Sequence, residues 1–317
     1  MPKVSVLMSV YNCENTVKKS IDSIVEQTFT DWELIICDDG SKDNTYKLVQ
    51  EIAKEEPRIV LIKNDRNRGL SYSLNHCLKV AKGSYCARMD GDDLCDSRRF
   101  EKQVEFLDNN KEYAFVSTRM TRFDEHGTYQ VPKSMESYSP TIKDFVKGSP
   151  FCHAPVMVRK SAYDAVSGYR DIPQTLGVED YDLWFRLYAK GYKGYILQES
   201  LYHMFDGRGA AKRRTFRRRL NEAWVRRSGY RMLKIPIILH ESNAFPGVAV
   251  KVMAKKADEI LLGFEEAKER ISNARKIVVT GTPTKVNSNR LSDEQKYNLK
   301  QEMKLKQDLP VVLFFGG

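Results

Sequence analysis

Strand-like and helix-like hydrophobic patterns alternate along roughly the first ninety residues. Short β-branched runs predict strands at residues 4–10, 32–37, 59–63 and 85–89, and amphipathic spacing predicts helices at residues 14–27, 44–54 and 69–80. This order predicts an α/β fold with a parallel sheet and helices on both of its faces. Ligands of such sheets bind beyond the carboxyl ends of the strands, so the residues after each strand are the first candidates for function.

The pattern after Met89 becomes mixed. It predicts strands at residues 113–117 and 154–159, a hairpin turn at 124–127, and helices at 97–109, 161–166 and 178–190. Residues 208–230 are expected to form a basic amphipathic helix, with Phe216, Leu220 and Trp224 on one side and arginines elsewhere.

Polar side chains gather after three of the predicted strands. Tyr11 and Asn12 follow the first strand. Five aspartates follow the second and fourth strands, namely Asp38, Asp39, Asp90, Asp92 and Asp93. Carboxylates this close repel one another unless a cation or hydrogen-bond donors compensate, which favours a bound divalent metal. In the alternative interpretation, Asp38, Asp39 and Asp43 serve as helix N-caps and turn formers.

The composition is that of a folded protein without a membrane span. The 317 residues are 41% hydrophobic and 30% charged, which is sufficient for a core in one or two domains. No apolar run reaches the roughly 18 residues that cross a membrane, and no signal-peptide pattern is present, so we expect a cytoplasmic protein, soluble or peripheral to the membrane. The six cysteines occur singly, which favours reduced thiols.

The net charge of +10 comes from one stretch of the chain. Residues 208–234 contain eleven lysines and arginines and one acid, Glu222, so the remainder is close to neutral. No motif with interleaved base-stacking aromatics accompanies this stretch, and we therefore expect no nucleic-acid partner. Two alternatives remain: the helix binds an anionic membrane surface, or its apolar residues pack on the domain and its arginines are solvated.

Five motifs, in this order, resemble those of family 2 glycosyltransferases. They are V-S-V-L-M-S-V-Y-N at residues 4–12, D-D-G-S at 38–41, N-R-G-L-S at 67–71, M-D-G-D-D at 89–93 and V-E-D-Y-D-L-W at 178–184. The resemblance covers about residues 1–234 and implies a GT-A fold, a Rossmann-like mixed sheet with helices on both faces. It also implies a nucleotide-sugar donor, UDP-linked in our expectation, and inverting transfer to a saccharide or lipid-linked acceptor in cell-surface polysaccharide or glycolipid synthesis.

The resemblance assigns the donor side to residues after the first, second and fourth strands. It implies that Asp92 binds Mn²⁺ or Mg²⁺, which neutralises the diphosphate leaving group. It implies that Asp90 contacts the ribose or supports the metal site, that Asp39 binds the uracil or ribose, and that Tyr11 lies against the base. Gly91 is expected to let the diphosphate approach the backbone.

Inverting transfer also requires a group that removes the proton of the acceptor hydroxyl. By resemblance this base is Asp180, with Glu179 beside it in the acceptor pocket; the alternative is that both are merely favourable acids in a first helical turn. His153, Trp184 and His203 are candidates for the acceptor side. For each of these three, a structural role in the core is the alternative.

The last part of the chain resembles a different family. I-P-I-I-L-H-E-S-N-A-F-P-G at residues 235–247 and three later segments resemble the middle of MurG, a GT-B transferase of peptidoglycan synthesis. We therefore expect three parts: a GT-A domain at 1–207, a basic helical segment at 208–234, and a partial MurG-like α/β fragment at 235–317 left by fusion or truncation. The alternative for the last part is a genuine accessory module that packs on the catalytic domain. Two alternative functions follow, MurG-type N-acetylglucosaminyl transfer and a catalytically inactive nucleotide-sugar-binding fusion product.

Overall fold

The computed structural model describes residues 1–130, 136–206, 215–272, 274–281, 292–303, 305–308 and 310–316. The chain forms two compact units, one of residues 1–144 and 148–226 and the other of residues 145–147 and 227–317. The boundary falls inside the predicted basic helix, a few residues before the expected division at Lys234. Residues 207–214, the beginning of the predicted basic segment, lie outside the described residues.

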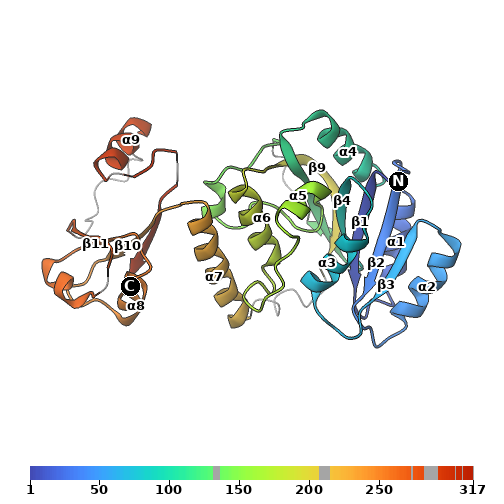
Figure 1. Ribbon diagram of the computed structural model, residues 1–317, viewed down its shortest axis with the longest axis horizontal. Helices are drawn as coiled ribbons and strands as arrows, with labels where there is room; N and C mark the ends of the chain where they lie inside the picture. Colours follow the sequence, from blue (N-terminus) through green and yellow to red (C-terminus); the bar gives the residue numbers. More distant parts are fainter. Residues whose placement is uncertain are drawn as a thin grey trace. The chain divides into compact units, whose positions relative to one another are not determined.

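A mixed sheet forms the centre of the first unit (Figure 1). Its strands are β1 (Val4–Val10), β2 (Trp32–Asp38), β3 (Ile59–Lys63), β4 (Tyr85–Asp90), β5 (Leu94–Cys95), β6 (Tyr113–Asp124), β7 (Gly127–Gln130), β8 (Met157–Arg159) and β9 (Lys193–Phe205). The described strands run in the order β3-β2-β1-β4-β8-β6-β9-β5, with β7 paired to β6. The first four are parallel, as predicted, whereas β8 is antiparallel to both of its neighbours.

Helices cover both faces of this sheet, because its inner strands are apolar at nearly every position. The helices of the first unit are α1 (Val17–Val25), α2 (Thr45–Glu55), α3 (Leu70–Val80), α4 (Arg99–Asn109), α5 (Lys160–Ala165) and α6 (Glu179–Ala189). The boundary between the two units falls within α7 (Phe216–Met232) and within the 3₁₀ turn η1 (Asp144–Val146). Alternate residues of β1 and β2 form one core with α1, α2 and α4. The intervening residues face α3, whose buried Cys77 lies against the backbone of both strands.

Local apolar patterns predicted most of these elements within a few residues, including the turn between β6 and β7. The long strand β9 was missed. It follows β6 in parallel, with register shifts near Thr118 and Arg119, and its polar Gln198, Glu199 and Ser200 interrupt the alternation that marks a strand.

The second unit has its own parallel sheet in the order β12-β11-β10-β13. Its elements are β10 (Ile237–Glu241), α8 (Val248–Ala254), β11 (Glu259–Leu262), a 3₁₀ turn η3 (Glu265–Arg270), β12 (Ile277–Val279), α9 (Asp293–Glu302) and β13 (Val312–Gly316). Leu239, Ile260 and Leu262 belong to its separate buried cluster. The α/β character expected for residues 235–317 is confirmed.

None of the helices among the described residues combines the length and the apolar character needed to cross a membrane. The cytoplasmic location stays a prediction.

Candidate active site

The carboxyl ends of β2, β1 and β4 meet at one edge of the sheet. In the strand register Val10 pairs with Asp38 and Ser9 pairs with Asp90, so the predicted convergence of these strand ends is confirmed. Tyr11 follows β1 and is 42% exposed, which leaves its ring accessible from this edge.

Asp39 holds the loop between β3 and α3. Its Oδ1 accepts hydrogen bonds from Asn64 Nδ2 (2.7 Å) and the Arg68 backbone N–H (2.8 Å), and its Oδ2 accepts one from Gly69 N–H (2.8 Å). The residue is only 3% exposed. The turn-forming alternative is therefore correct for Asp39, and its expected contact with uracil or ribose stays a prediction.

Two neighbouring aspartates also bond to backbone or to adjacent side chains. Asp38 Oδ2 accepts from Ser41 N–H at 3.2 Å, while its buried Oδ1 has no hydrogen-bond partner. Asp43 accepts from the backbone and hydroxyl of Thr45 at the start of α2, and despite partial desolvation these bonds lower the pKa of Asp43. Both residues thus shape the turn after β2.

Gly40 allows this turn to pack against the β3–α3 loop. Its φ of +74° is a conformation that side chains disfavour, and a Cβ there would lie 2.7 Å from the Arg66 carbonyl carbon. Gly91 has a related role, because a Cβ there would lie 2.8 Å from Val10 Cγ1. Gly91 therefore packs closely against Val10 at the end of β1. The expected approach of a diphosphate to Gly91 stays a prediction.

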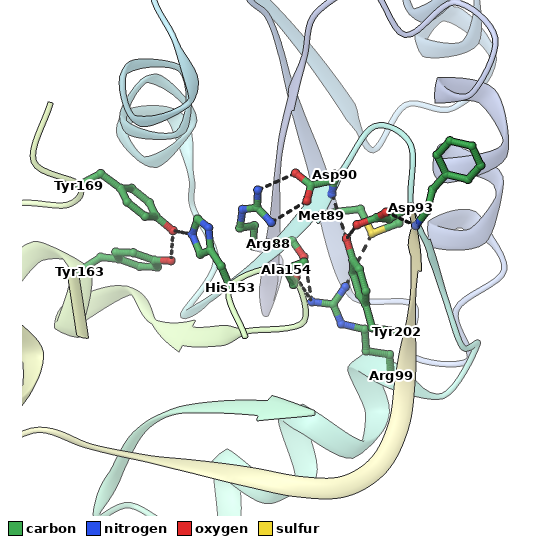
Figure 2. Close-up of polar contacts among 11 residues, drawn as sticks. Arg88, Met89, Asp90, Asp93, Arg99, His153, Ala154, Tyr163, Tyr169 and Tyr202 are labelled. Carbon is green, nitrogen blue, oxygen red and sulfur yellow. Dashed lines mark hydrogen bonds and ion pairs between the residues drawn. The ribbon is translucent and has the colours of Figure 1, made fainter. Parts of the chain in front are cut away.

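A buried arginine fixes Asp90. Arg88, on β4, is 5% exposed and donates from Nη1 and Nη2 to the two carboxylate oxygens of Asp90 at 2.8 and 2.6 Å (Figure 2). Burial disfavours the charged form of Arg88, but Asp90 and the neighbouring Tyr202 and Tyr169 together have the larger effect, so the pKa of Arg88 is raised. Sequence reasoning missed Arg88, although a charged residue within the otherwise apolar run Tyr85–Met89 was an available signal.

Asp93 joins the turn after β4 to the end of β9. Its Oδ2 accepts from Tyr202 Oη (2.8 Å) and its Oδ1 accepts from Phe205 N–H (2.7 Å). The Tyr202 oxygen also accepts from the Asp90 backbone N–H, so one tyrosine bridges both aspartates (Figure 2). Burial, followed by the charges of Asp90 and Asp92, raises the pKa of Asp93 to about 8.

Arg99, on α4, hydrogen-bonds to the backbone of β4 near the same turn. It is fully buried and donates from Nη2 to the Arg88 carbonyl oxygen at 2.8 Å, while its Nε donates to Gln103. Its guanidinium lies 5.0 Å from the centre of the Tyr202 ring. Burial lowers the pKa of Arg99. Nothing in the linear sequence distinguished this arginine from its exposed neighbour Arg98.

Asp92 is half-buried and shares the turn with Asp90 and Asp93. Asp90 is paired with Arg88, and burial, followed by the charges of Asp90 and Asp92, raises the pKa of Asp93. Such a site suits a hard cation, yet the described residues contain no group of three or more metal-ligating side chains placed to hold one. The binding of Mn²⁺ or Mg²⁺ by Asp92 therefore stays a prediction.

Asp180 begins α6 together with Glu179. Burial, and then the charge of Glu179, raises the pKa of Asp180 to about 6, whereas the charge of Arg88 acts in the opposite direction. Asp180 is therefore a carboxylate whose pKa lies close to neutral, as a general base requires. Arg88 is thus within electrostatic reach of both Asp90 and Asp180.

His153 belongs to a buried polar chain beside Arg88 (Figure 2). Its Nε2 lies 2.8 Å from Tyr169 Oη, which in turn lies 2.9 Å from Tyr163 Oη. Burial, together with the charge of Arg88, lowers the pKa of His153, so its ring is neutral at pH 7. These contacts give His153 a structural role next to the site; acceptor contact stays a prediction.

The structure corrects the expected role of Trp184. Its side chain is fully buried and stacks on Phe115 with the ring centres 4.9 Å apart, so Trp184 is a core residue and is not accessible to an acceptor. His203 lies on β9, opposite Leu94 and hydrogen-bonded to Thr121 at 2.5 Å. Burial lowers the pKa of His203, and its place on the acceptor side stays a prediction.

Side chains from α3, α6 and α7 hydrogen-bond to the loop before α6. Asn75 bonds both the N–H and the carbonyl of Tyr169, and Arg186 donates to the Val166 and Gly168 carbonyls. On α7, Asn221 Nδ2 donates to the carbonyls of Pro173 and Leu176 at 3.0 and 2.9 Å. This bonding fixes the position at which α6 presents Asp180.

Comparison with known proteins identifies the family of this chain. The model of the family described as Glycosyl transferase family 2 matches residues 5–166. The chain is 45% identical over 237 residues to EpsE of Bacillus subtilis, which carries a glycosyltransferase designation; the match covers 74% of this chain and 84% of EpsE. The chain therefore belongs to glycosyltransferase family 2.

Two further similarities concern the fold and a relative with a described reaction. WfaP of Escherichia coli, a UDP-Glc:alpha-D-GlcNAc-diphosphoundecaprenol beta-1,3-glucosyltransferase, is 30% identical over 195 residues, covering 61% of this chain and 73% of WfaP. Residues 1–349 of TarS from S. aureus, in complex with UDP-GlcNAc, superpose with a TM-score of 0.61 at 18% identity over 73% of this chain and 66% of that chain. This likeness confirms the predicted GT-A fold. The resemblance of residues 235–317 to MurG stays a prediction.

Proposed function

We propose that this family 2 glycosyltransferase transfers one sugar from a UDP-sugar to a hydroxyl of a lipid-linked saccharide, with inversion, in cell-surface polysaccharide synthesis. Two observations carry the proposal: the paired hydrogen bonds between Arg88 and the donor-side Asp90, and the half-buried carboxylate of Asp180, whose pKa is raised to about 6 and on which the charge of Arg88 acts. The names of WfaP and of the TarS complex support a UDP-sugar donor, and that of WfaP supports a diphosphate-lipid acceptor.

Each carboxylate has a separate task in this proposal. Asp180 accepts the proton of the acceptor hydroxyl as the new glycosidic bond forms and the bond to the diphosphate breaks. Asp90, oriented by Arg88, binds the donor's ribose. A Mg²⁺ or Mn²⁺ ion held by Asp92 and the diphosphate would supply charge neutralisation for the leaving group.

Two variants separate these tasks. Asp92→Asn should lose metal-dependent UDP binding, measured by calorimetry with and without Mn²⁺, because it removes an anionic oxygen ligand. Asp180→Asn should keep that binding but lose release of UDP in the presence of acceptor. Asp22→Asn, on the exposed surface of α1, is the matched control and should change neither.

Two results would contradict the proposal. UDP and Mn²⁺ binding by Asp92→Asn at the parental affinity would remove the metal assignment. A parental chain that binds UDP-sugars but transfers none of them to any diphosphate-lipid saccharide would support the alternative of an inactive nucleotide-sugar-binding protein.

A further inference from the structure

Three large apolar side chains lie exposed near the first turns of α7. Phe216 is 76% exposed and Leu220, one turn later on the same side, is 54% exposed. Leu176, from the loop before α6, is 57% exposed. The other side of the helix is anchored instead, since Val225 is fully buried. The packing alternative raised by the sequence is therefore wrong for Phe216 and Leu220.

Hydrogen bonding brings Leu176 to this part of α7. Asn221, next to Leu220, bonds the Leu176 carbonyl at 2.9 Å. The adjacent Gly177 lies against the Arg218 side chain, because a Cβ on that glycine would be 3.6 Å from Arg218 Cγ. Segments about forty residues apart thus contribute to one surface.

Three consecutive arginines accompany these apolar side chains. Arg217, Arg218 and Arg219 are all exposed, and among the described residues none of them forms an ion pair with a carboxylate. The acid that follows on the helix, Glu222, is bonded to Arg226 at 2.8 Å. The positive charge at the start of α7 is therefore not neutralised by the described part of the protein.

We propose that this α7 surface, defined as Leu176 and residues 216–220, docks on an anionic phospholipid bilayer. Interleaved apolar and basic side chains match the boundary between acyl chains and phosphate groups. A polyanion such as nucleic acid would match the arginines but not Phe216 and Leu220. Leu176 precedes Asp180 by only four residues, so docking would bring the proposed base close to a membrane-borne acceptor. This last step rests on the proposed function.

Co-sedimentation of the full chain with vesicles tests the proposal. The protein should bind vesicles of equal parts phosphatidylcholine and phosphatidylglycerol at low salt, bind phosphatidylcholine vesicles far less, and be released by salt. The double variant Arg217→Gln/Arg219→Gln should bind more weakly by about fivefold for each arginine removed. Lys19→Gln/Lys47→Gln removes the same charge from exposed positions of α1 and α2 and should bind as the parent does.

The apolar contribution has its own matched pair. Phe216→Ser should weaken binding to the anionic vesicles, whereas Phe245→Ser, at a 71% exposed phenylalanine of the second unit, should not. Absence of vesicle binding at low salt, equal binding by all variants, or retention on DNA without vesicle binding would overturn the proposal. The variants with weakened vesicle binding should transfer sugar to a short, soluble acceptor analogue at the parental rate. If the parent protein transfers no sugar to that analogue, the result contradicts the proposed function and not the docking proposal.

Discussion

Asp180 has surroundings that set the pH range of the reaction. A base must be ionised to accept a proton, and burial with the neighbouring Glu179 raises the pKa of Asp180 to about 6. We expect the rate of transfer to rise with pH up to about 6 and to fall about tenfold for each unit below it. The rate of UDP release at saturating donor and acceptor, measured from acid to neutral pH, checks this. A rate that does not change through pH 6 would assign the base to another residue.

The same burial makes Asp180 costly for folding. Because its folded pKa of about 6 lies above the ordinary range of aspartate, the ionised carboxylate is disfavoured in the folded state, by about 3 kcal/mol. Asp180→Asn should therefore increase the free energy of unfolding by roughly 1–3 kcal/mol above pH 6, and this gain should disappear below about pH 4. Urea unfolding at both pH values measures it. Asp164→Asn, at an exposed position of α5, should show no such gain.

Arg88 pairs with the donor-side carboxylate Asp90, and its charge lowers the pKa of Asp180. Arg88→Met would leave the Asp90 carboxylate without its positively charged partner. The substitution should lower the free energy of unfolding by about 3 kcal/mol and raise the KM for the donor. Arg88→Lys restores a charge without the paired hydrogen bonds and should recover part of the donor affinity. Arg88→Met/Asp90→Asn should recover stability but not affinity; if it recovered both, Arg88 would have only a structural role.

Motif residues of the site could be predicted from the sequence, but the residues that hold them could not. Asp90 and Asp180 stand in short motifs that a reader of the sequence can recognise. The contributions of Arg88 and Tyr202 depend on partners elsewhere in the fold, since Tyr202 reaches Asp93 across more than a hundred residues. The role of Trp184 was also undecidable, because its motif does not reveal which helix face is buried.

At the scale of elements, local apolar patterns predicted where strands and helices form, whereas hydrogen bonds between distant loops could not be predicted. The buried strands of the parallel sheet were predicted closely because apolar runs are local features. Helix α1 was expected to begin at Glu14 but begins at Val17, because Cys13 and Glu14 bond through their backbone N–H groups to Thr45 and Asp43. Such ties between distant loops leave no periodic signal in the sequence.

The contact of α7 with the loop before α6 leads to a prediction about catalysis. Asn221→Ala removes two hydrogen bonds to that loop and should lower stability by about 1–2 kcal/mol. Since the loop positions Asp180 and not the donor, kcat should fall while the dissociation constant for UDP stays unchanged. Steady-state kinetics and UDP titration measure the two effects. Asn109→Ala, at the exposed end of α4, is the control; equal effects of both variants would contradict a positioning role for Asn221.

At the scale of the whole molecule, the candidate site belongs to one unit. Asp39, Asp90, Asp92 and Asp180 all lie in residues 1–144 and 148–226, and the core around β1 and β2 draws only on that unit. The second unit has its own sheet and its own buried cluster. This division explains how the sequence can resemble one transferase family over its first part and carry different motifs afterwards.

Removal of residues 235–317, which form most of the second unit, should therefore leave transfer intact. A chain ending at Lys234 keeps α7 whole, together with Asn221 and the loop that it bonds. We expect this truncated chain to fold, to bind UDP with parental affinity, and to release UDP in the presence of acceptor at a rate within about twofold of the parent, because none of the proposed catalytic groups is removed. Circular dichroism establishes folding before activity is compared. A soluble, folded truncation without transfer would mean that residues 235–317 support the catalytic unit, and would give the MurG-like segment a function of its own.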